Sequence, residues 1–204
     1  KEGKNIFTSL DLGSHIKANE ALKGRMGAVV AVEIDSGAIV TLFSSPSYSI
    51  NDLSNGISNN QFNALIQDPK KPFFNRALKG RYPPASTIKP ALGIFGVQNQ
   101  LIDWNFSIDD PGFFTLPEDG RIYRGWKKGG HGKVDLDKAI VVSSNTYFFS
   151  LAYRSDIDDL AEHLSKFGFG KKVCLDCFDE DEGLIPSPQW KRNKLNSGWS
   201  RGDT

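Results

Sequence analysis

The sequence contains the stretch Tyr82-Pro83-Pro84-Ala85-Ser86-Thr87-Ile88-Lys89-Pro90. The paired prolines impose extended backbone, and the residues that follow carry apolar side chains at helical spacing as far as Gln98. A proline is tolerated in the first turn of a helix, so Pro90 fits this position. The stretch therefore predicts a helix that begins at Ser86, with Lys89 on the same face one turn later.

Ser86 and Lys89 together have the chemistry of an activated nucleophile. A serine hydroxyl becomes nucleophilic when a base removes its proton, and a desolvated lysine amine can be that base. The same S-x-x-K spacing occurs at Ser14 and Lys17, but in a polar leader that offers nothing to bury a lysine. On these residues alone, a second interpretation stays open, in which Ser86 only caps the helix and Lys89 extends into water.

Ser143-Ser144-Asn145 is a second candidate because it places polar side chains between two apolar helical stretches. A buried hydroxyl or amide at such a position must find hydrogen-bond partners. The S-x-N pattern also occurs at Ser49 and Ser58, in a segment without apolar periodicity. The alternative for Ser143-Ser144-Asn145 is that it simply ends one helix and caps the next.

The remaining elements follow from periodicity and turn signals. Residues 27–43 predict a β-hairpin with both arms largely buried, and Ser36-Gly37 marks its turn. Residues 102–133 predict a loop-rich region without a simple strand pair, and the tail from 183 to 204 shows no long periodic element. The predicted helices lie at residues 16–22, 86–98, 135–142, 146–153 and 157–167, with one helical turn near 61–66 in an irregular segment from 44 to 72.

Charge and composition exclude some functions. The chain of 204 residues carries 25 Lys and Arg against 24 Asp and Glu, a formal net charge of +1, so no global field attracts nucleic acid. No apolar run reaches the length of a membrane-spanning helix. The two cysteines, Cys174 and Cys177, are most simply two ordinary thiols; a local disulfide is the alternative. No second cysteine pair completes a zinc ribbon.

The segment from Asn75 to Pro90 resembles the active-site region of class B penicillin-binding proteins, which are peptidoglycan D,D-transpeptidases. Residues 27–32 with 44–48 are similar to the first hairpin of that family, and Ser143-Ser144-Asn145 stands where its S-x-N motif stands. Residues 110–114 and 123–132 resemble the penicillin-binding protein 2 branch, which serves cell elongation. The resemblance implies an α+β fold of the penicillin-binding protein and serine β-lactamase type, an antiparallel sheet packed between helices.

The same resemblance implies roles for four residues. Ser86 would attack the carbonyl between the terminal D-alanines of a stem peptide and form an acyl-enzyme, and Lys89 would accept its proton. Ser143 would relay protons to the leaving amine, and Asn145 would hold the substrate amide. β-Lactam antibiotics would acylate Ser86 and inhibit the enzyme, and no cofactor is implied.

The resemblance also implies partners and a location. The expected partners are stem peptides ending in D-Ala-D-Ala, β-lactams, a membrane glycosyltransferase and other elongation proteins, with no nucleic acid. The expected location is the periplasmic face of the bacterial inner membrane, with an anchoring N-terminal helix that this chain lacks. Two other functions stay open: a β-lactam sensor domain, which is a binding module, and a serine β-lactamase, although no carboxylate base for deacylation is recognisable.

Three features depart from the family pattern. The third motif, Lys-Thr/Ser-Gly on an edge strand, is absent, so residues 1–204 are expected to be the N-terminal and central part of a single transpeptidase domain and to be inactive in isolation. Ala85 replaces the usual glycine, which is expected to be a mild change because alanine fits any backbone geometry with negative φ. Some relatives carry zinc near the active centre; Asp110 and His131 could be ligands here, but Gly125 and Ser144 stand where further ligands are expected, so no metal site is predicted.

Overall fold

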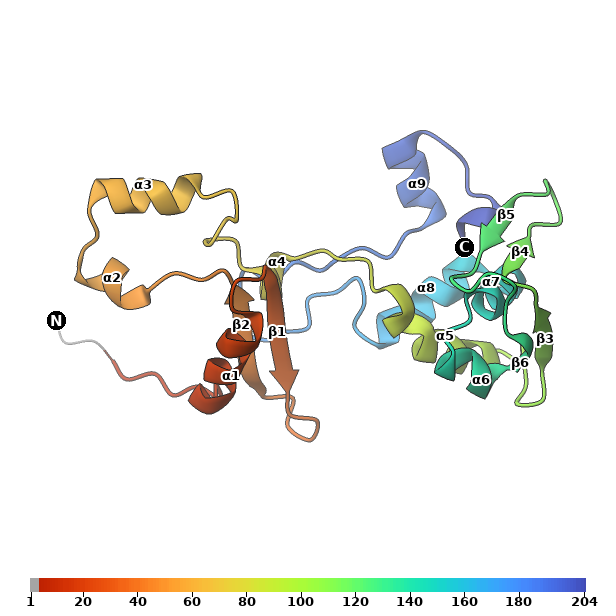
Figure 1. The fold of residues 1–204 in the computed structure, drawn as a ribbon, viewed down its shortest axis with the longest axis horizontal. Helices are drawn as coiled ribbons and strands as arrows, with labels where there is room; N and C mark the ends of the chain where they lie inside the picture. Colours follow the sequence, from red (N-terminus) through yellow and green to blue (C-terminus); the bar gives the residue numbers. More distant parts are fainter. Residues whose placement is uncertain (1–3) are drawn as a thin grey trace. The chain divides into compact units, whose positions relative to one another are not determined.

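The computed structural model describes residues 4–204, which divide into two compact units (Figure 1). The first unit holds the residues up to Arg81 together with Cys174–Asp181. The second holds Tyr82–Val173 and Glu182–Thr204. Both units combine helices with antiparallel strand pairs, so the predicted α+β class is confirmed.

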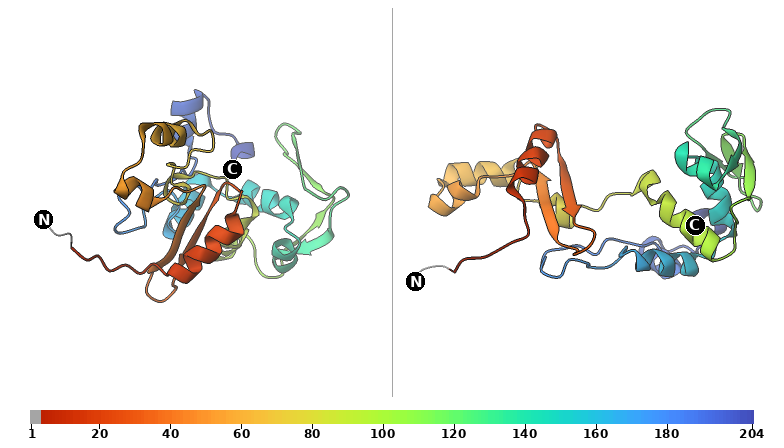
Figure 2. Two further views of the ribbon diagram at one scale, coloured as in Figure 1. Left: turned by 60° about the vertical axis from the view of Figure 1, so that its left-hand side comes forward. Right: turned by 90° about the horizontal axis from the view of Figure 1, so that it is seen from below.

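The hairpin of the first unit consists of β1 (Gly27–Val32) and β2 (Ile39–Ser45), paired in the register Gly27 opposite Ser45. Helix α1 (Leu12–Leu22) packs along β2, as both views in Figure 2 show. Alternate residues of β1 face away from this helix, and Val30 and Val32 are about half exposed (49% and 51%). The hairpin is therefore confirmed, but the expectation that both arms are largely buried is wrong, because one face of β1 stays uncovered within the described residues.

The segment expected to be irregular contains two short helices. Ser49 caps α2 (Ile50–Asn55) by accepting a hydrogen bond from the Asp52 amide. Ser58 begins α3 (Asn59–Gln67) with a capping box. Both additional S-x-N matches of the sequence are thus helix caps, which explains why these residues recur there.

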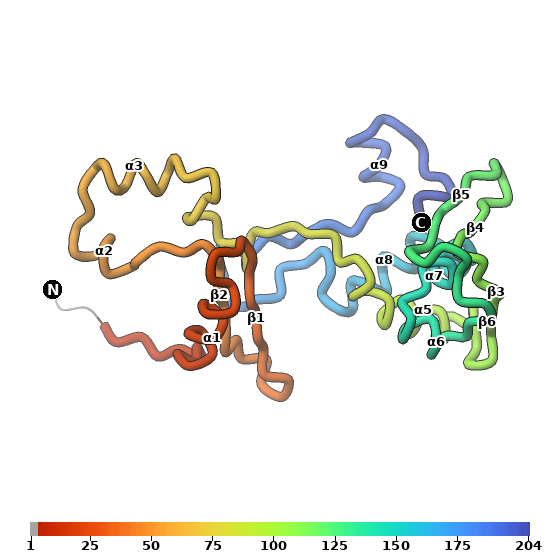
Figure 3. The backbone as a smooth tube through the Cα atoms, viewed as in Figure 1, coloured from red at the N-terminus to blue at the C-terminus, as the bar shows by residue number. Residues whose placement is uncertain are grey.

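The chain returns to the first unit at residues 174–181 (Figure 3). A hydrogen bond and an ion pair hold this segment beside α4 (Arg76–Lys79). The Asp181 amide donates to the Leu78 carbonyl over 2.8 Å, and Lys79 pairs with Asp179 at 3.0 Å. Cys174 and Cys177 form a disulfide within this segment. The preferred interpretation as ordinary thiols is therefore wrong, and the local disulfide is what the structure contains.

The second unit is built around a helical core. Its buried side chains come mainly from the helices and from β6; they are Ile102, Val134, Leu136, Ala139, Tyr147, Phe148 and Leu151. The helices of this unit are η1 (Ala85–Ile88), α5 (Lys89–Gln98), α6 (Leu136–Val141), α7 (Asn145–Arg154), α8 (Ile157–Lys166), α9 (Pro188–Leu195) and η2 (Arg201–Asp203). A Cβ on Gly96 would lie 2.9 Å from side-chain atoms of Ile102 and Leu151, so this glycine lets α5 approach α7 closely. The two helices that carry the candidate site are thereby packed against each other.

Two strand pairs flank this core. Strand β3 (Ser107–Asp110) pairs with β6 (Gly132–Asp135), and β4 (Phe113–Thr115) pairs with β5 (Ile122–Arg124). The region is loop-rich and is not one simple strand pair, as expected, but its short strands are not predicted, because strands of three or four residues are too short to show periodicity. Helix α9 was also not predicted from the tail. Among residues 4–204, no helix is long and apolar enough to cross a membrane.

Candidate active site

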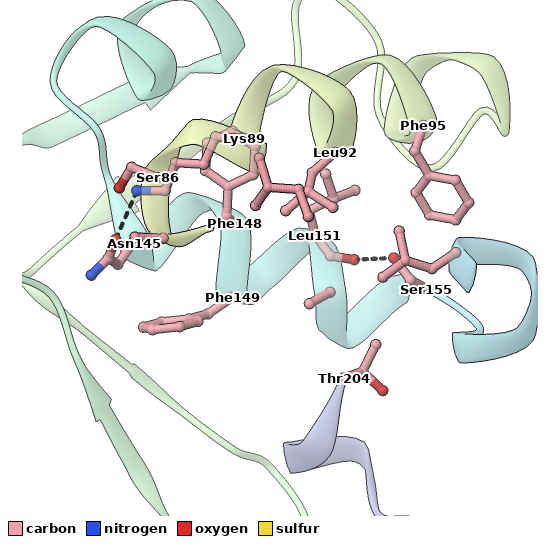
Figure 4. A pocket seen from close by; sticks show the side chains of 14 residues that line it. Ser86, Lys89, Leu92, Phe95, Asn145, Phe148, Phe149, Leu151, Ser155 and Thr204 are labelled. Carbon is pink, nitrogen blue, oxygen red and sulfur yellow. Dashed lines mark hydrogen bonds between the residues drawn. The ribbon is translucent and has the colours of Figure 1, made fainter. Parts of the chain in front are cut away.

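The second unit brings all four predicted site residues together. Ser86 lies in η1, a 3-10 turn that begins one residue earlier at Ala85, and Lys89 begins α5. The predicted helix start at Ser86 is therefore correct to within one residue, but the α-helix itself begins at Lys89. Ser143 lies in the turn between α6 and α7, and Asn145 is the first residue of α7. In Figure 4 the Ser86, Lys89 and Asn145 side chains gather at one end of a pocket.

Lys89 is the buried centre of this group. Its side chain is 7% exposed, and its ammonium donates to the Ser143 carbonyl (2.8 Å), the Ser143 hydroxyl (3.0 Å) and the Asn145 Oδ1 (2.7 Å). The Phe148 ring lies 5.5 Å from the nitrogen. All three oxygens are neutral, and desolvation lowers the pKa of Lys89 from its ordinary value of 10.5. The interpretation of Lys89 as a lysine that extends into water is therefore wrong.

Ser86 is exposed and reaches Lys89 through Ser143. The Ser143 hydroxyl oxygen lies 2.8 Å from the Ser86 hydroxyl oxygen and 3.0 Å from the Lys89 nitrogen. These contacts form a continuous hydrogen-bonded path from an accessible hydroxyl to a buried amine. Such a path can carry a proton from the nucleophile to a base.

Two non-glycine residues beside the site have left-handed backbone. Ala85 has φ 50° and Ser143 has φ 54°. The sequence expectation for Ala85 assumed a negative φ and is wrong, since this backbone region favours glycine. Each residue carries strain of the kind that surrounding structure must hold in place.

The pocket extends from the polar group along an apolar wall. It has a volume of about 390 Å³, and Leu92, Phe148, Phe149 and Leu151 line its middle (Figure 4). Phe95 and Ser155 lie at its other end in the same view. The Ser86 hydroxyl and the amide of Asn145 thus open on a cavity in which a peptide-sized ligand could be oriented.

Asp110 and His131, the two candidate zinc ligands, lie together, but Gly125 and Ser144 supply no further strong ligand beside them. Asp110 Oδ2 accepts hydrogen bonds from His131 Nδ1 (2.9 Å) and the Ser144 hydroxyl (2.7 Å). The other ring nitrogen, His131 Nε2, is buried and has no hydrogen-bond partner among the described residues. Gly125 offers no side chain, and a serine hydroxyl is a poor zinc ligand. Within residues 4–204, three potential ligands come together only at Cys174, Asp176 and Cys177, and both sulfurs there form the disulfide.

Sequence reasoning missed one contact to this site. The Trp126 indole N–H donates to the Val142 carbonyl over 3.2 Å, directly before Ser143. Trp126 is 64% exposed and lies in a loop of glycines and charged residues, where no periodicity marks it. The sequence predicts that a buried hydroxyl in the Ser143-Ser144-Asn145 turn needs a hydrogen-bond partner. The Ser144 hydroxyl has one, since it donates to Asp110.

Comparison with known sequences agrees with this geometry. Residues 27–204 match the family described as "Penicillin binding protein transpeptidase domain". Over 202 residues, 99% of this chain, it is 42% identical to the peptidoglycan D,D-transpeptidase MrdA of Acinetobacter baumannii and 37% identical to MrdA of Escherichia coli K12. The chain spans only 30% and 32% of the length of these two relatives.

Solved structures show the same fold. Pseudomonas aeruginosa PBP2 in complex with WCK 5153 superposes with a TM-score of 0.89 at 40% identity, covering 95% of this chain and 44% of that one. PBP2 of Helicobacter pylori in complex with MreC gives 0.86 at 32% identity, covering 92% and 35%. With the predicted resemblance confirmed in sequence and in fold, this chain belongs to the penicillin-binding protein transpeptidase domain family.

Proposed function

We propose that the full-length protein is a peptidoglycan D,D-transpeptidase that crosslinks stem peptides during cell elongation, and that both units belong to one transpeptidase domain. The observation that carries the proposal is the hydrogen-bonded path from exposed Ser86 through Ser143 to buried Lys89 at one end of a pocket. The names of the relatives support it, since both are D,D-transpeptidases.

The first half-reaction forms an acyl-enzyme. The Ser86 oxygen attacks the carbonyl carbon between the two terminal D-alanines, and its proton passes through the Ser143 hydroxyl to the Lys89 amine. The backbone N–H of Ser86 supplies one donor to the oxyanion of the tetrahedral intermediate. The carbon–nitrogen bond then breaks, and D-alanine leaves after its nitrogen takes the proton back along the same path.

The second half-reaction makes the crosslink. An amine of a neighbouring stem attacks the ester carbon, and its proton passes to the base. The ester bond to Ser86 breaks, and the serine oxygen regains a proton. Asn145 keeps the donor peptide in place through its side-chain amide, whose Oδ1 also accepts from Lys89. No step needs a cofactor.

The carbonyl of a β-lactam mimics the one between the D-alanines, so a β-lactam would undergo the first half-reaction but not the second. The acyl group would remain on Ser86 and block the enzyme. We place the protein at the periplasmic face of the bacterial inner membrane. Its partners in this proposal are a membrane glycosyltransferase and other elongation proteins; the complex of a relative with MreC supports partners of this kind.

One assay separates this function from its two rivals. The full-length protein is incubated with stem peptides ending in D-Ala-D-Ala and an acceptor amine, and released D-alanine and crosslinked dimer are measured together. A transpeptidase yields both, and Ser86→Ala yields neither. Acylation by penicillin without any crosslinked product would indicate a sensor domain, and rapid turnover of penicillin would indicate a β-lactamase; either result would overturn the proposal.

A further inference from the structure

We propose that Asp110 is a positioning residue that holds the turn carrying Ser143 and Asn145, through hydrogen bonds to Ser144 and His131 and without a metal ion. The kinetic test of this proposal measures acylation by penicillin and therefore rests on the proposed transpeptidase function. A second readout, described below, needs no activity.

Asp110 is the centre of a buried hydrogen-bond network. Its side chain is 2% exposed; Oδ2 accepts from Ser144 Oγ and His131 Nδ1, and Oδ1 accepts from the Gly112 amide at 2.7 Å. Burial raises the pKa of Asp110, but the hydrogen bonds outweigh it and bring the pKa to about 2. An ionised carboxylate only accepts, so His131 and Ser144 must be the donors.

Ser144 connects this network to the two site residues on either side of it in the chain. It is fully buried, and its hydroxyl both donates to Asp110 and accepts from the Tyr147 amide at 3.2 Å. The second contact caps α7, which begins with Asn145. Because Ser143 has left-handed backbone, a fixed neighbour is what keeps it in this strained conformation.

A second contact holds the preceding residue of the turn. His131 lies against Trp126, with ring centroids 5.3 Å apart, and the Trp126 indole binds the Val142 carbonyl. The His131 amide donates to the Asp110 carbonyl at 3.1 Å. A Cβ on Gly130 would lie 1.9 Å from that carbonyl oxygen, so only glycine lets this loop come so close. The loop, the carboxylate and the turn thus form one packed assembly.

The position of the turn decides the proton path. Ser143 Oγ must stay within hydrogen-bond distance of both the Ser86 oxygen and the Lys89 nitrogen. A displacement of about 1 Å can cost on the order of 10²-fold in rate. Loss of the Asp110 contact should therefore slow the acylation step, while the apolar wall of the pocket continues to bind ligand.

The main test compares Asp110→Asn with Asp109→Asn in the full-length protein. Asp109 is the neighbouring residue of β3, but its side chain is exposed. In Asp110→Asn, the side-chain NH2 faces either the two donors Ser144 and His131 or, when flipped, the Gly112 amide, so at least one hydrogen bond is lost. We expect the first-order constant for acylation by penicillin to fall about 10- to 100-fold, with little change in the dissociation constant of the noncovalent complex. Asp109→Asn should behave as wild type.

Two further variants cover the case in which Asp110→Asn unfolds. Trp126→Phe removes the hydrogen bond to Val142 and keeps a smaller ring beside His131, and it should slow acylation by a few-fold. Ser144→Ala removes the link between Asp110 and the turn. Where both Asp110→Asn and Ser144→Ala fold, the double variant should lose hardly more than either single variant, because both act through one contact.

Hydrogen exchange measures the turn without any substrate. The Ser144 amide donates to the Ala139 carbonyl, and the Tyr147 amide to Ser144 Oγ. Both amides should exchange faster in Asp110→Asn than in wild type and in Asp109→Asn. If Asp110→Asn does not fold, the same comparison is made with Trp126→Phe. If wild-type protein is not acylated, the proposed function fails, but this measurement still decides the positioning role.

Three results would overturn the inference. The first is a folded Asp110→Asn variant, or a Trp126→Phe variant in its place, with wild-type acylation and wild-type exchange. The second is an Asp110→Asn variant that binds penicillin more weakly in the noncovalent complex but is acylated with the wild-type first-order constant. The third is bound zinc in the purified protein by elemental analysis, together with slower acylation or faster exchange after chelation.

Discussion

The hydroxyl oxygens of Ser86 and Ser143 lie 2.8 Å apart, although 57 residues separate them in the chain. Ser143 also accepts from Lys89 at 3.0 Å, so it stands between the nucleophile and the buried amine. In the proposed mechanism, this order of contacts would let Ser143 relay a proton to Lys89 as the base. The following expectations test that arrangement.

Lys89→Arg should abolish acylation of the full-length protein by penicillin. A guanidinium keeps the positive charge but does not deprotonate in proteins, so it cannot accept the Ser86 proton. We expect a loss of at least about 10²–10⁴-fold, the range for a general base. Lys17→Arg is the matched control, because Lys17 has the same spacing from a serine but is exposed and paired with Glu20. Near-normal acylation by Lys89→Arg would show that charge alone is required.

The acylation rate should rise with pH and level off below pH 10.5, the ordinary pKa of lysine. Burial disfavours the charged amine and lowers the pKa of Lys89, so the neutral base is populated at lower pH than in a free lysine. Stopped-flow acylation across the neutral and alkaline range measures this. A rate that keeps rising through pH 10.5, as for an unburied lysine, would contradict the assignment.

The fold and the site were predictable from the sequence to different degrees. Ser86, Lys89, Ser143 and Asn145 could be predicted because their two motifs stand in the order found in a known family. From their positions alone, both motifs could have been simple helix caps. The positive φ of Ala85 could not be predicted, because it depends on how the chain enters η1. The network of Asp110 was not predicted either, because it joins β3 to a loop and a turn that are far apart in the chain.

Ala85→Gly should stabilise the protein by about 1 kcal/mol or less. Left-handed backbone costs a residue with a Cβ about 1–2 kcal/mol, and the greater freedom of glycine in the unfolded chain offsets part of that gain. Ala91→Gly, inside α5, is the control and should destabilise by about 1 kcal/mol. Urea unfolding of both variants gives the comparison. Equal destabilisation by the two substitutions would refute the idea that Ala85 is strained.

Asp110→Asn should destabilise the protein near neutral pH and progressively less in acid. The folded pKa of about 2 lies below the ordinary 3.8, so ionised Asp110 contributes stability above pH 3.8 that is lost as the pH falls towards 2. The contribution is about 2 kcal/mol at pH 7. Urea unfolding at a series of pH values measures it, with Asp109→Asn as the control. If the free energy of unfolding of Asp110→Asn differed from that of wild type by the same amount at every pH down to 2, the lowered pKa of Asp110 would be contradicted.

Intact-protein mass spectrometry of the full-length protein treated with penicillin tests directly whether Ser86 is the nucleophile. We expect one added acyl group on wild type, none on Ser86→Ala, and one on Ser14→Ala, which removes the serine of the other S-x-x-K match. The label should map to the peptide that contains Ser86. A label that persists on Ser86→Ala would contradict the assignment of Ser86 as the nucleophile.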